Sequence, residues 1–329
     1  NTTAFSFGPL GAKGFAFLNM LQLIGWTSIM IYDAMLALQE LAPLSPMIWT
    51  TAIGALVILW LFIGLHNTGY IQAIVSVLLL GLTIYMGAHM IAQWPSESSL
   101  ITSGNMSFIA ALELSIAMPL SWLPLISDYT RESKKPFAAS LTSATVYTIT
   151  SIVMYTLGLS AAIFGGGDSI ITIMMNAGLG LAGLIVIIFS TVTTTFMDAY
   201  SAGVSSTTIY NGASSKGVAV IVTIVGTIAA ILYPMDDITD FLYLIGSVFA
   251  PMIAILLADY FINRQQVQTL SAYLVRGLIW AISVGLYHYM LHSESTIGAT
   301  LPAFTMAFVV TAIVGFISKT AHSSAEIKQ

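Results

Sequence analysis

The sequence contains no cysteine and very little charge. Of its 329 residues, 7% are charged and 57% are hydrophobic, and the mean hydropathy is +0.91. A typical soluble domain contains about 25% charged residues. The absence of cysteine excludes disulfides and cysteine-ligated metal sites. The scarcity of charge excludes an ordinary soluble domain and predicts an all-α polytopic membrane protein.

Ten apolar runs are long enough to cross a bilayer, which takes about 20 residues per helix. We predict spans at 13–38, 46–65, 69–92, 106–127, 137–164, 174–209, 217–233, 238–262, 273–292 and 299–318. The sixth run is too long for one crossing, so a short extra helix is expected near the SIITIMM stretch. Residues 1–329 are expected to form a single transmembrane domain.

One side of this topology lacks basic residues altogether. If the first span runs from inside to outside, one set of loops and adjoining helix ends holds every Lys and Arg: Lys13, Arg131, Lys134, Lys135, Lys216, Arg264, Arg276, Lys319 and Lys328. The other set holds Glu40, Glu97, Asp168, Asp236, Asp237, Asp240 and Glu294. Basic loops stay in the cytoplasm. We therefore expect a multi-pass protein of the cell inner (plasma) membrane with a cytoplasmic C-terminus.

Polar residues interrupt the first span in LQLIGWTSIMIYD. Trp26 lies about 13 residues beyond Lys13, or roughly 20 Å along a helix, which is past the interfacial aromatic belt. Gln22 precedes it by four residues, so both side chains share one helix face. This face is a candidate ligand contact. The alternative is a packed tryptophan and a glutamine bonded to a neighbouring helix.

The fourth span contains two prolines, in LSIAMPLSWLPLISDYTR. Pro119 and Pro124 each lack a backbone donor and clash with the preceding turn, so the helix is expected to kink or unwind between them. Backbone groups freed at membrane depth need protein, water or a ligand as partners. Discontinuous helices of this kind build transporter sites, although prolines also kink helices with no ligand nearby. Glu113 is expected to support such a site or to face the outer vestibule.

Six Ser or Thr residues and a carboxylate occur within the sixth span, in STVTTTFMDAYSAG. Ser190, Thr193 and Thr194 are spaced i, i+3, i+4, and their oxygens suit a hard cation. The alternative is that these hydroxyls bond back to their own helix. Asp198 follows Thr194 by four residues on the same face. A carboxylate within a span is functional by default.

Three stretches, SWLPLISDYTR, STVTTTFMDAYSAG and FLYLIGSVFAPMIAILLADYFINR, resemble the nucleobase–cation-symport-1 (NCS1) transporters. That family includes cytosine permeases, hydantoin permeases and purine or allantoin carriers. Within it, PLSWLPLISDYTR looks most like the hydroxymethylpyrimidine branch. The resemblance extends from Phe5 to about Arg264. It implies a LeuT-type fold of five-plus-five inverted repeats, in which these ten spans match helices three to twelve and the first two helices are not part of this sequence.

The resemblance also implies residue roles. Trp26 would stack on the flat heterocycle, and Gln22 lies near the ring-binding amide, although its spacing from the tryptophan differs by one from that in cytosine permeases. The kinked span would supply a substrate wall from Met118, Pro119, Ser121 and Trp122. The eighth family helix would supply half of a sodium site from Ser190, Thr193 and Thr194. The first family helix would supply the other half and one wall of the pocket.

Two positions depart from the cytosine permeases, which carry asparagines after the threonine pair. This chain has Thr195 and then Asp198 there. We assign both to substrate binding, and the difference points away from cytosine as the preferred cargo. Asp198 is expected to accept a hydrogen bond from the amino edge of an aminopyrimidine, as in charge-assisted recognition.

The predicted function is sodium-coupled import of a pyrimidine or related planar heterocycle by alternating access, with hydroxymethylpyrimidine and cytosine-like rings as candidates. We expect no enzyme activity and no cofactor, with sodium as the coupling ion. The expected partners are the heterocycle, sodium and the lipid bilayer, and no nucleic acid. One alternative is a proton-coupled nucleobase, allantoin or hydantoin carrier with Asp198 or Glu113 as the proton site. A channel or an intramembrane enzyme would need continuous polar pore-lining helices or a metal cluster.

Overall fold

A computed structural model gives the fold. It describes residues 2–41, 43–63, 68–92, 106–130, 133–164, 172, 174–175, 178–264, 266–293 and 295–326. The helices are α1 (Ala4–Leu41), α2 (Pro46–Ile63), α3 (Thr68–Ala92), α4 (Phe108–Thr130), α5 (Pro136–Phe164), α7 (Gly180–Ile209), α8 (Ser215–Leu232), α9 (Thr239–Leu257), the π-helical turn η1 (Ala258–Asn263), α10 (Leu270–His292) and α11 (Thr300–Glu326). Within these ranges, ten helices are long and apolar enough to cross a membrane. The predicted number of spans and the all-helical class are confirmed.

Most predicted boundaries agree with the helices to within a few residues, and the largest differences are at the two ends. α1 begins at Ala4 rather than at residue 13, because a short helical segment precedes a break at Gly8 (φ 66°, ψ −175°) and Pro9. Glycine suits this left-handed φ, and the ring of Tyr273 packs where a side chain at position 8 would project. α11 continues beyond the predicted end at 318. Helical residues at 172, 174 and 175 precede α7, and the rest of the SIITIMM stretch lies outside the described residues.

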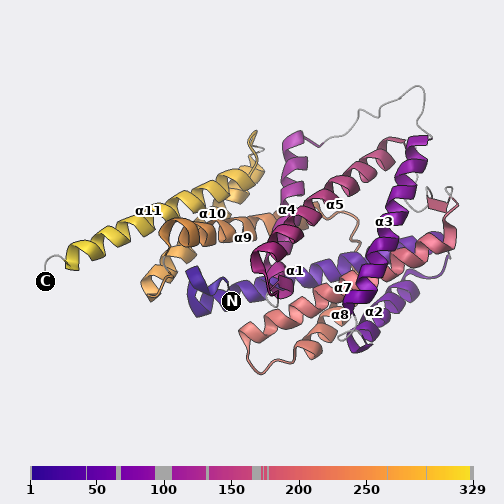
Figure 1. Ribbon diagram of the computed structural model, residues 1–329, viewed down its shortest axis with the longest axis horizontal. Helices are drawn as coiled ribbons and strands as arrows, with labels where there is room; N and C mark the ends of the chain where they lie inside the picture. Colours follow the sequence, from indigo (N-terminus) through magenta and orange to yellow (C-terminus); the bar gives the residue numbers. More distant parts are fainter. Residues whose placement is uncertain are drawn as a thin grey trace.

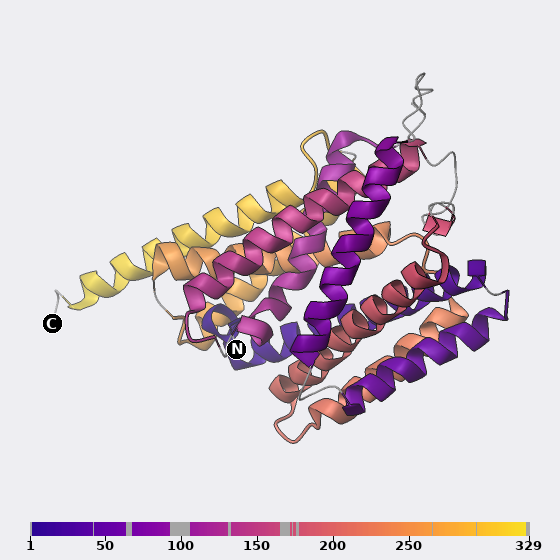
Figure 2. The same ribbon diagram turned by 45° about the vertical axis from the view of Figure 1, so that its right-hand side comes forward.

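The long helix α1 runs through the middle of the molecule (Figure 1). It packs against α7, α8, α2, α10 and α9. The helices α9, α10 and α11 form a second group, and α4 packs on α9. In both views α3 and α5 lie beside this arrangement and cross it obliquely (Figure 2). α1, α4, α7 and α9 therefore enclose the region in which the polar residues of the sequence meet.

One basic residue predicted to lie beside the cytoplasmic loops is buried between helices. Arg276 of α10 donates to both carboxylate oxygens of Asp259 in η1, at 2.9 and 3.3 Å. Asn263 donates to the same carboxylate and to the Thr311 carbonyl in α11. The side chains of Arg276 and Asp259 are 7% and 0% exposed. This ion pair joins η1 to α10, and Asn263 extends the network to α11.

Candidate functional site

A buried polar network links three helices around Gln22. Gln22 Nε2 donates to the Ser121 carbonyl of α4 at 2.9 Å and to Asn19 Oδ1, one turn earlier in α1, at 2.7 Å. Asn19 Nδ2 donates to Ser205 Oγ of α7 at 2.9 Å. The side chains of Gln22 and Asn19 are buried, and Gln22 Oε1 is buried without a hydrogen-bond partner among the described residues. The predicted substrate-binding residues Gln22 and Ser121 are thus brought into contact.

Trp26 lies one turn after Gln22 and meets an aromatic ring of α9. Its indole and the Phe241 ring are in edge contact, with centroids 5.4 Å apart and an interplanar angle of 73°. Gly25 makes this approach possible, because a Cβ at that position would lie 2.5 Å from the Phe241 ring. The indole Nε1 is buried and has no partner among the described residues. One face of α1 therefore carries an unpaired acceptor and an unpaired donor, each of which costs about 1–3 kcal/mol when buried.

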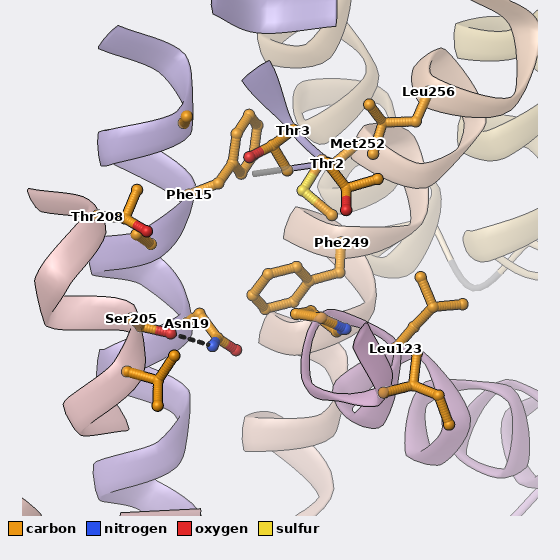
Figure 3. A pocket seen from close by; sticks show the side chains of 15 residues that line it. Thr2, Thr3, Phe15, Asn19, Leu123, Ser205, Thr208, Phe249, Met252 and Leu256 are labelled. Carbon is orange, nitrogen blue, oxygen red and sulfur yellow. Dashed lines mark hydrogen bonds between the residues drawn. The ribbon is translucent and has the colours of Figure 1, made fainter. Parts of the chain in front are cut away.

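A cavity of about 270 Å³ lies beside this network, between α1, α4, α7 and α9. Its walls include the rings of Phe15 and Phe249, and the Asn19 amide and the Ser205 hydroxyl lie across the cavity from the Phe249 ring (Figure 3). None of the described side chains that line it is charged. Ligand cavities are typically apolar with a few convergent polar groups, so this one suits a neutral, flat molecule.

The two prolines of α4 leave its backbone helical. The helix continues from Phe108 to Thr130 across Pro119 and Pro124, so the predicted unwinding is not observed. Different residues of α4 nevertheless contact different helices, α1 and α5. Ser121 is turned toward Gln22, with its hydroxyl donating to the Met118 carbonyl.

Met118 and Trp122 line a groove between α4 and α5. The Trp122 ring stacks on Tyr147 of α5, with centroids 5.2 Å apart and an interplanar angle of 17°. The structure therefore places two of the predicted wall residues against α5, and Trp122 also packs against the cluster of α1 and α7 side chains that includes Leu23.

The hydroxyl face of α7 gathers three oxygens at one point. Thr193 Oγ1 and Thr194 Oγ1 donate to the Ser190 carbonyl at 3.0 and 2.8 Å. Thr193 also donates to the Phe189 carbonyl. Both hydroxyls therefore bond back to their own helix, as the alternative prediction stated, yet the oxygens lie together and keep lone pairs. Neutral hydroxyl and carbonyl oxygens are suitable donors to a hard cation, and Thr194 is exposed while Thr193 is buried.

The two remaining predicted site residues of α7 differ in their surroundings. Thr195 is fully buried and bonds to the Thr191 carbonyl and to Met30 Sδ of α1. Asp198 is partly buried, and no described residue makes a hydrogen bond to its carboxylate. An unpaired carboxylate within a membrane-spanning helix is unfavourable unless water or a ligand completes it.

Glu113, which lines a cavity at the start of α4, also makes a contact that the sequence did not predict. Its Oε1 accepts hydrogen bonds from the Ala299 and Thr300 backbone N–H groups at the start of α11, both at 2.5 Å. The first N–H groups of a helix have no partner within the helix, and here a carboxylate from α4 caps them. Gly298 has φ +77°, and a Cβ there would lie 2.5 Å from the same oxygen. Glu113 is thus committed to a contact between helices.

Sequence reasoning missed Asn19, Ser205, Phe241 and Tyr147. Asn19 precedes Gln22 by three residues and so shares its helix face, which is a signal that was present in the sequence. Ser205 occurs among several hydroxyl residues that bond only to their own helix, such as Ser206. The two aromatic partners carry no local signal, because their contacts depend on how α9 and α5 pack.

Comparisons with known proteins agree with this architecture. The family model described as permease for cytosine/purines, uracil, thiamine, allantoin matches residues 4–327. Cytosine permeases of Escherichia coli K12 and O157:H7 are 22% identical over 210 residues, which cover 63% of this chain and 50% of each relative. The chain thus spans about half the length of the curated relatives it matches.

Among solved structures, that of Mhp1, a nucleobase-cation-symport-1 family transporter in a closed conformation with bromovinylhydantoin bound, superposes with a TM-score of 0.78. The superposition covers 97% of this chain and 79% of Mhp1 at 17% identity. It confirms the expected transporter fold. Since the family model matches nearly the whole chain, this multi-pass membrane protein belongs to the NCS1 family of permeases for cytosine, purines, uracil, thiamine and allantoin.

Proposed function

We propose that this chain forms the ring-binding core of a sodium-coupled importer of a pyrimidine or related planar heterocycle. The observation that carries the proposal is the buried face of α1, where Gln22 Oε1 and Trp26 Nε1 both lack partners among the described residues. A heterocycle supplies a flat face for the indole and hydrogen-bonding atoms for the amide. The cytosine permeases and the hydantoin-bound transporter are consistent with this ligand class.

The coupling ion would be held by the oxygens that meet at the Ser190 carbonyl. The donors that fit are this carbonyl and the hydroxyls of Thr193 and Thr194, which would turn their hydrogens away from the ion. Bound sodium would supply positive charge at this point of α7. These neutral oxygens supply only part of a coordination sphere, so further ligands are needed to complete it.

We propose that Asp198 accepts a hydrogen bond from an amino group of the ligand. It lies one turn after Thr194, and its carboxylate is free of hydrogen bonds from the described residues. An exocyclic amino group would donate to it and offset the cost of a carboxylate in a span. The distribution of the basic residues supports a cytoplasmic C-terminus, and an inward sodium gradient would drive import.

Proton coupling is the second candidate, and the unpaired Asp198 carboxylate is the observation that favours it. Protonation would remove its charge without any partner. Glu113 is a weaker choice for the proton site, because its carboxylate already caps α11. Transport that persists in sodium-free buffer and follows the proton gradient would select this candidate over sodium coupling.

The test is a thermal-shift screen of the purified protein with cytosine, uracil, hydantoin and a hydroxymethyl-aminopyrimidine, each with sodium and with choline as the replacement cation. The proposal predicts that at least one planar heterocycle raises the melting temperature, and more so in sodium. Trp26→Ala, which removes the proposed stacking surface, should reduce the ligand-dependent shift. Stabilisation by none of the ligands in either cation would refute the proposed function.

A further inference from the structure

Asn19 lies between the cavity and Gln22, and nothing in the sequence patterns or the comparisons assigns it a role. Its side chain is 5% exposed. Its carbonyl oxygen accepts from Gln22 and its amide nitrogen donates to Ser205. In Figure 3 this amide reaches from α1 toward the space that also receives the Phe249 ring. Because both ends of this buried amide are hydrogen-bonded, its orientation is fixed, and it constrains the orientation of Gln22.

The donor and acceptor roles in the hydrogen bonds that link Ser121, Gln22 and Asn19 follow from one backbone carbonyl. The Ser121 carbonyl can only accept, so the atom of Gln22 that faces it is the nitrogen. The second hydrogen of that nitrogen goes to Asn19 Oδ1 at 2.7 Å. Both donor hydrogens of Gln22 are therefore used, and the only hydrogen-bonding atom left to a ligand is Oε1, which is buried and unpaired.

We propose that Asn19 is a positioning residue that holds Gln22 with its acceptor toward the ligand, so that the transported heterocycle must present an N–H group at this point. This inference rests on the proposed function. A ligand with a ring nitrogen lone pair or an N-methyl group at that position leaves Gln22 Oε1 unpaired. Sites built around a buried polar group reject analogues that lack its partner far more strongly than apolar pockets reject a change of one methylene.

Ser205 completes the arrangement because its hydroxyl accepts from Asn19 and keeps its own hydrogen for another acceptor. Asn19 thereby links Gln22 on α1 to Ser205 on α7, and Gln22 itself donates to a backbone carbonyl of α4. The specificity of the site is thus set by one obligate acceptor, the Ser121 carbonyl, and by one relay residue, Asn19.

The experiment measures equilibrium binding of cytosine, 1-methylcytosine and N4-methylcytosine to the purified protein in sodium. The parent protein should discriminate against at least one methylated ligand. Asn19→Leu, which has a similar branched shape but no hydrogen-bonding atom, should weaken cytosine binding by about 2- to 12-fold, the equivalent of one hydrogen bond. It should change binding of the rejected ligand little, so the selectivity ratio falls. Asn19→Asp keeps an oxygen for Gln22 and should preserve the ratio.

Two further variants separate positioning from folding. Asn19→Ala is measured in the same way, so that the test does not depend on how Leu packs. In a Gln22→Met background, Asn19→Leu should no longer alter the ratio, because the residue through which it acts is gone. An equal loss for all three ligands, or an unchanged ratio in Asn19→Leu and Asn19→Ala, would overturn the inference while the proposed function stands. A parent protein that binds none of these ligands and none of the heterocycles of the thermal-shift screen would refute both.

Discussion

The contact between Glu113 and α11 gives a prediction whose size follows from the structure. One carboxylate oxygen accepts from two backbone N–H groups at 2.5 Å, and the Glu113 side chain is buried. Hydrogen bonds to a charged group contribute about 1.5–3 kcal/mol each, and a lost helix cap costs about 0.5–2 kcal/mol. Glu113→Ala removes both bonds and leaves two N–H groups unpaired, so we expect a loss of roughly 3 kcal/mol or more. Glu113→Gln keeps an oxygen acceptor and should lose roughly 1–2 kcal/mol.

The assay is thermal or chemical unfolding of the purified protein, followed by intrinsic fluorescence. Asp240→Ala is the matched control: this exposed acidic residue also lies in the first turn of a helix, where its charge is worth only about 0.3–1 kcal/mol. The expected order of stability is parent, Asp240→Ala, Glu113→Gln and then Glu113→Ala. If Glu113→Ala is no less stable than Asp240→Ala, the cap does not hold α11 in the way the structure indicates.

Three other perturbations follow from the same contacts. Arg276→Met should destabilise the protein by about 3–5 kcal/mol because it leaves Asp259 buried and unpaired; the double variant Arg276→Met/Asp259→Leu should recover much of that loss in the same unfolding assay, and equal losses would argue against a paired role. Trp26→Ala should weaken heterocycle binding by about 1–3 kcal/mol, and Trp26→Phe should lose less of the binding free energy. Calorimetric titrations of Trp26→Ala that match the parent would show that this residue only packs in the core. Thr194→Ala should shift sodium activation by the equivalent of about 1–3 kcal/mol with little change in ligand recognition at saturating sodium; an activation curve that matches the parent would remove Thr194 from the cation site.

The architecture was largely predictable because the bilayer constrains it. Long apolar runs separated by polar loops identify the spans almost by themselves, and the ten helices agree with that count. The break at Gly8 could not be read in advance, since its cause includes a ring of α10 packed on the backbone. The burial of Arg276 was missed because its partner, Asp259, lies in η1, 17 residues earlier in the chain.

The candidate site was predictable as a set of residue types but not as a geometry. Gln22 and Ser121 meet, and Thr193 and Thr194 converge on the Ser190 carbonyl. The prolines of α4 left two outcomes open, a kink or unwinding, because a kinked helix and a broken one share the same sequence signal; the helix continues across both prolines. Glu113 looked like a functional carboxylate because nothing local reveals a cap contributed 186 residues away along the chain.

The central claim is that heterocycle and sodium bind to one coupled site, and reciprocal calorimetric titration tests it most directly. Heterocycle affinity is measured at zero and saturating sodium, and sodium affinity with and without the heterocycle. Linkage requires the two enhancements to be equal, and coupling energies between sites are typically about 1–3 kcal/mol, or roughly 5- to 150-fold. The account predicts such an equal enhancement, with heterocycle binding weakened in Trp26→Ala and sodium binding weakened in Thr194→Ala. Heterocycle binding that is independent of sodium would contradict it.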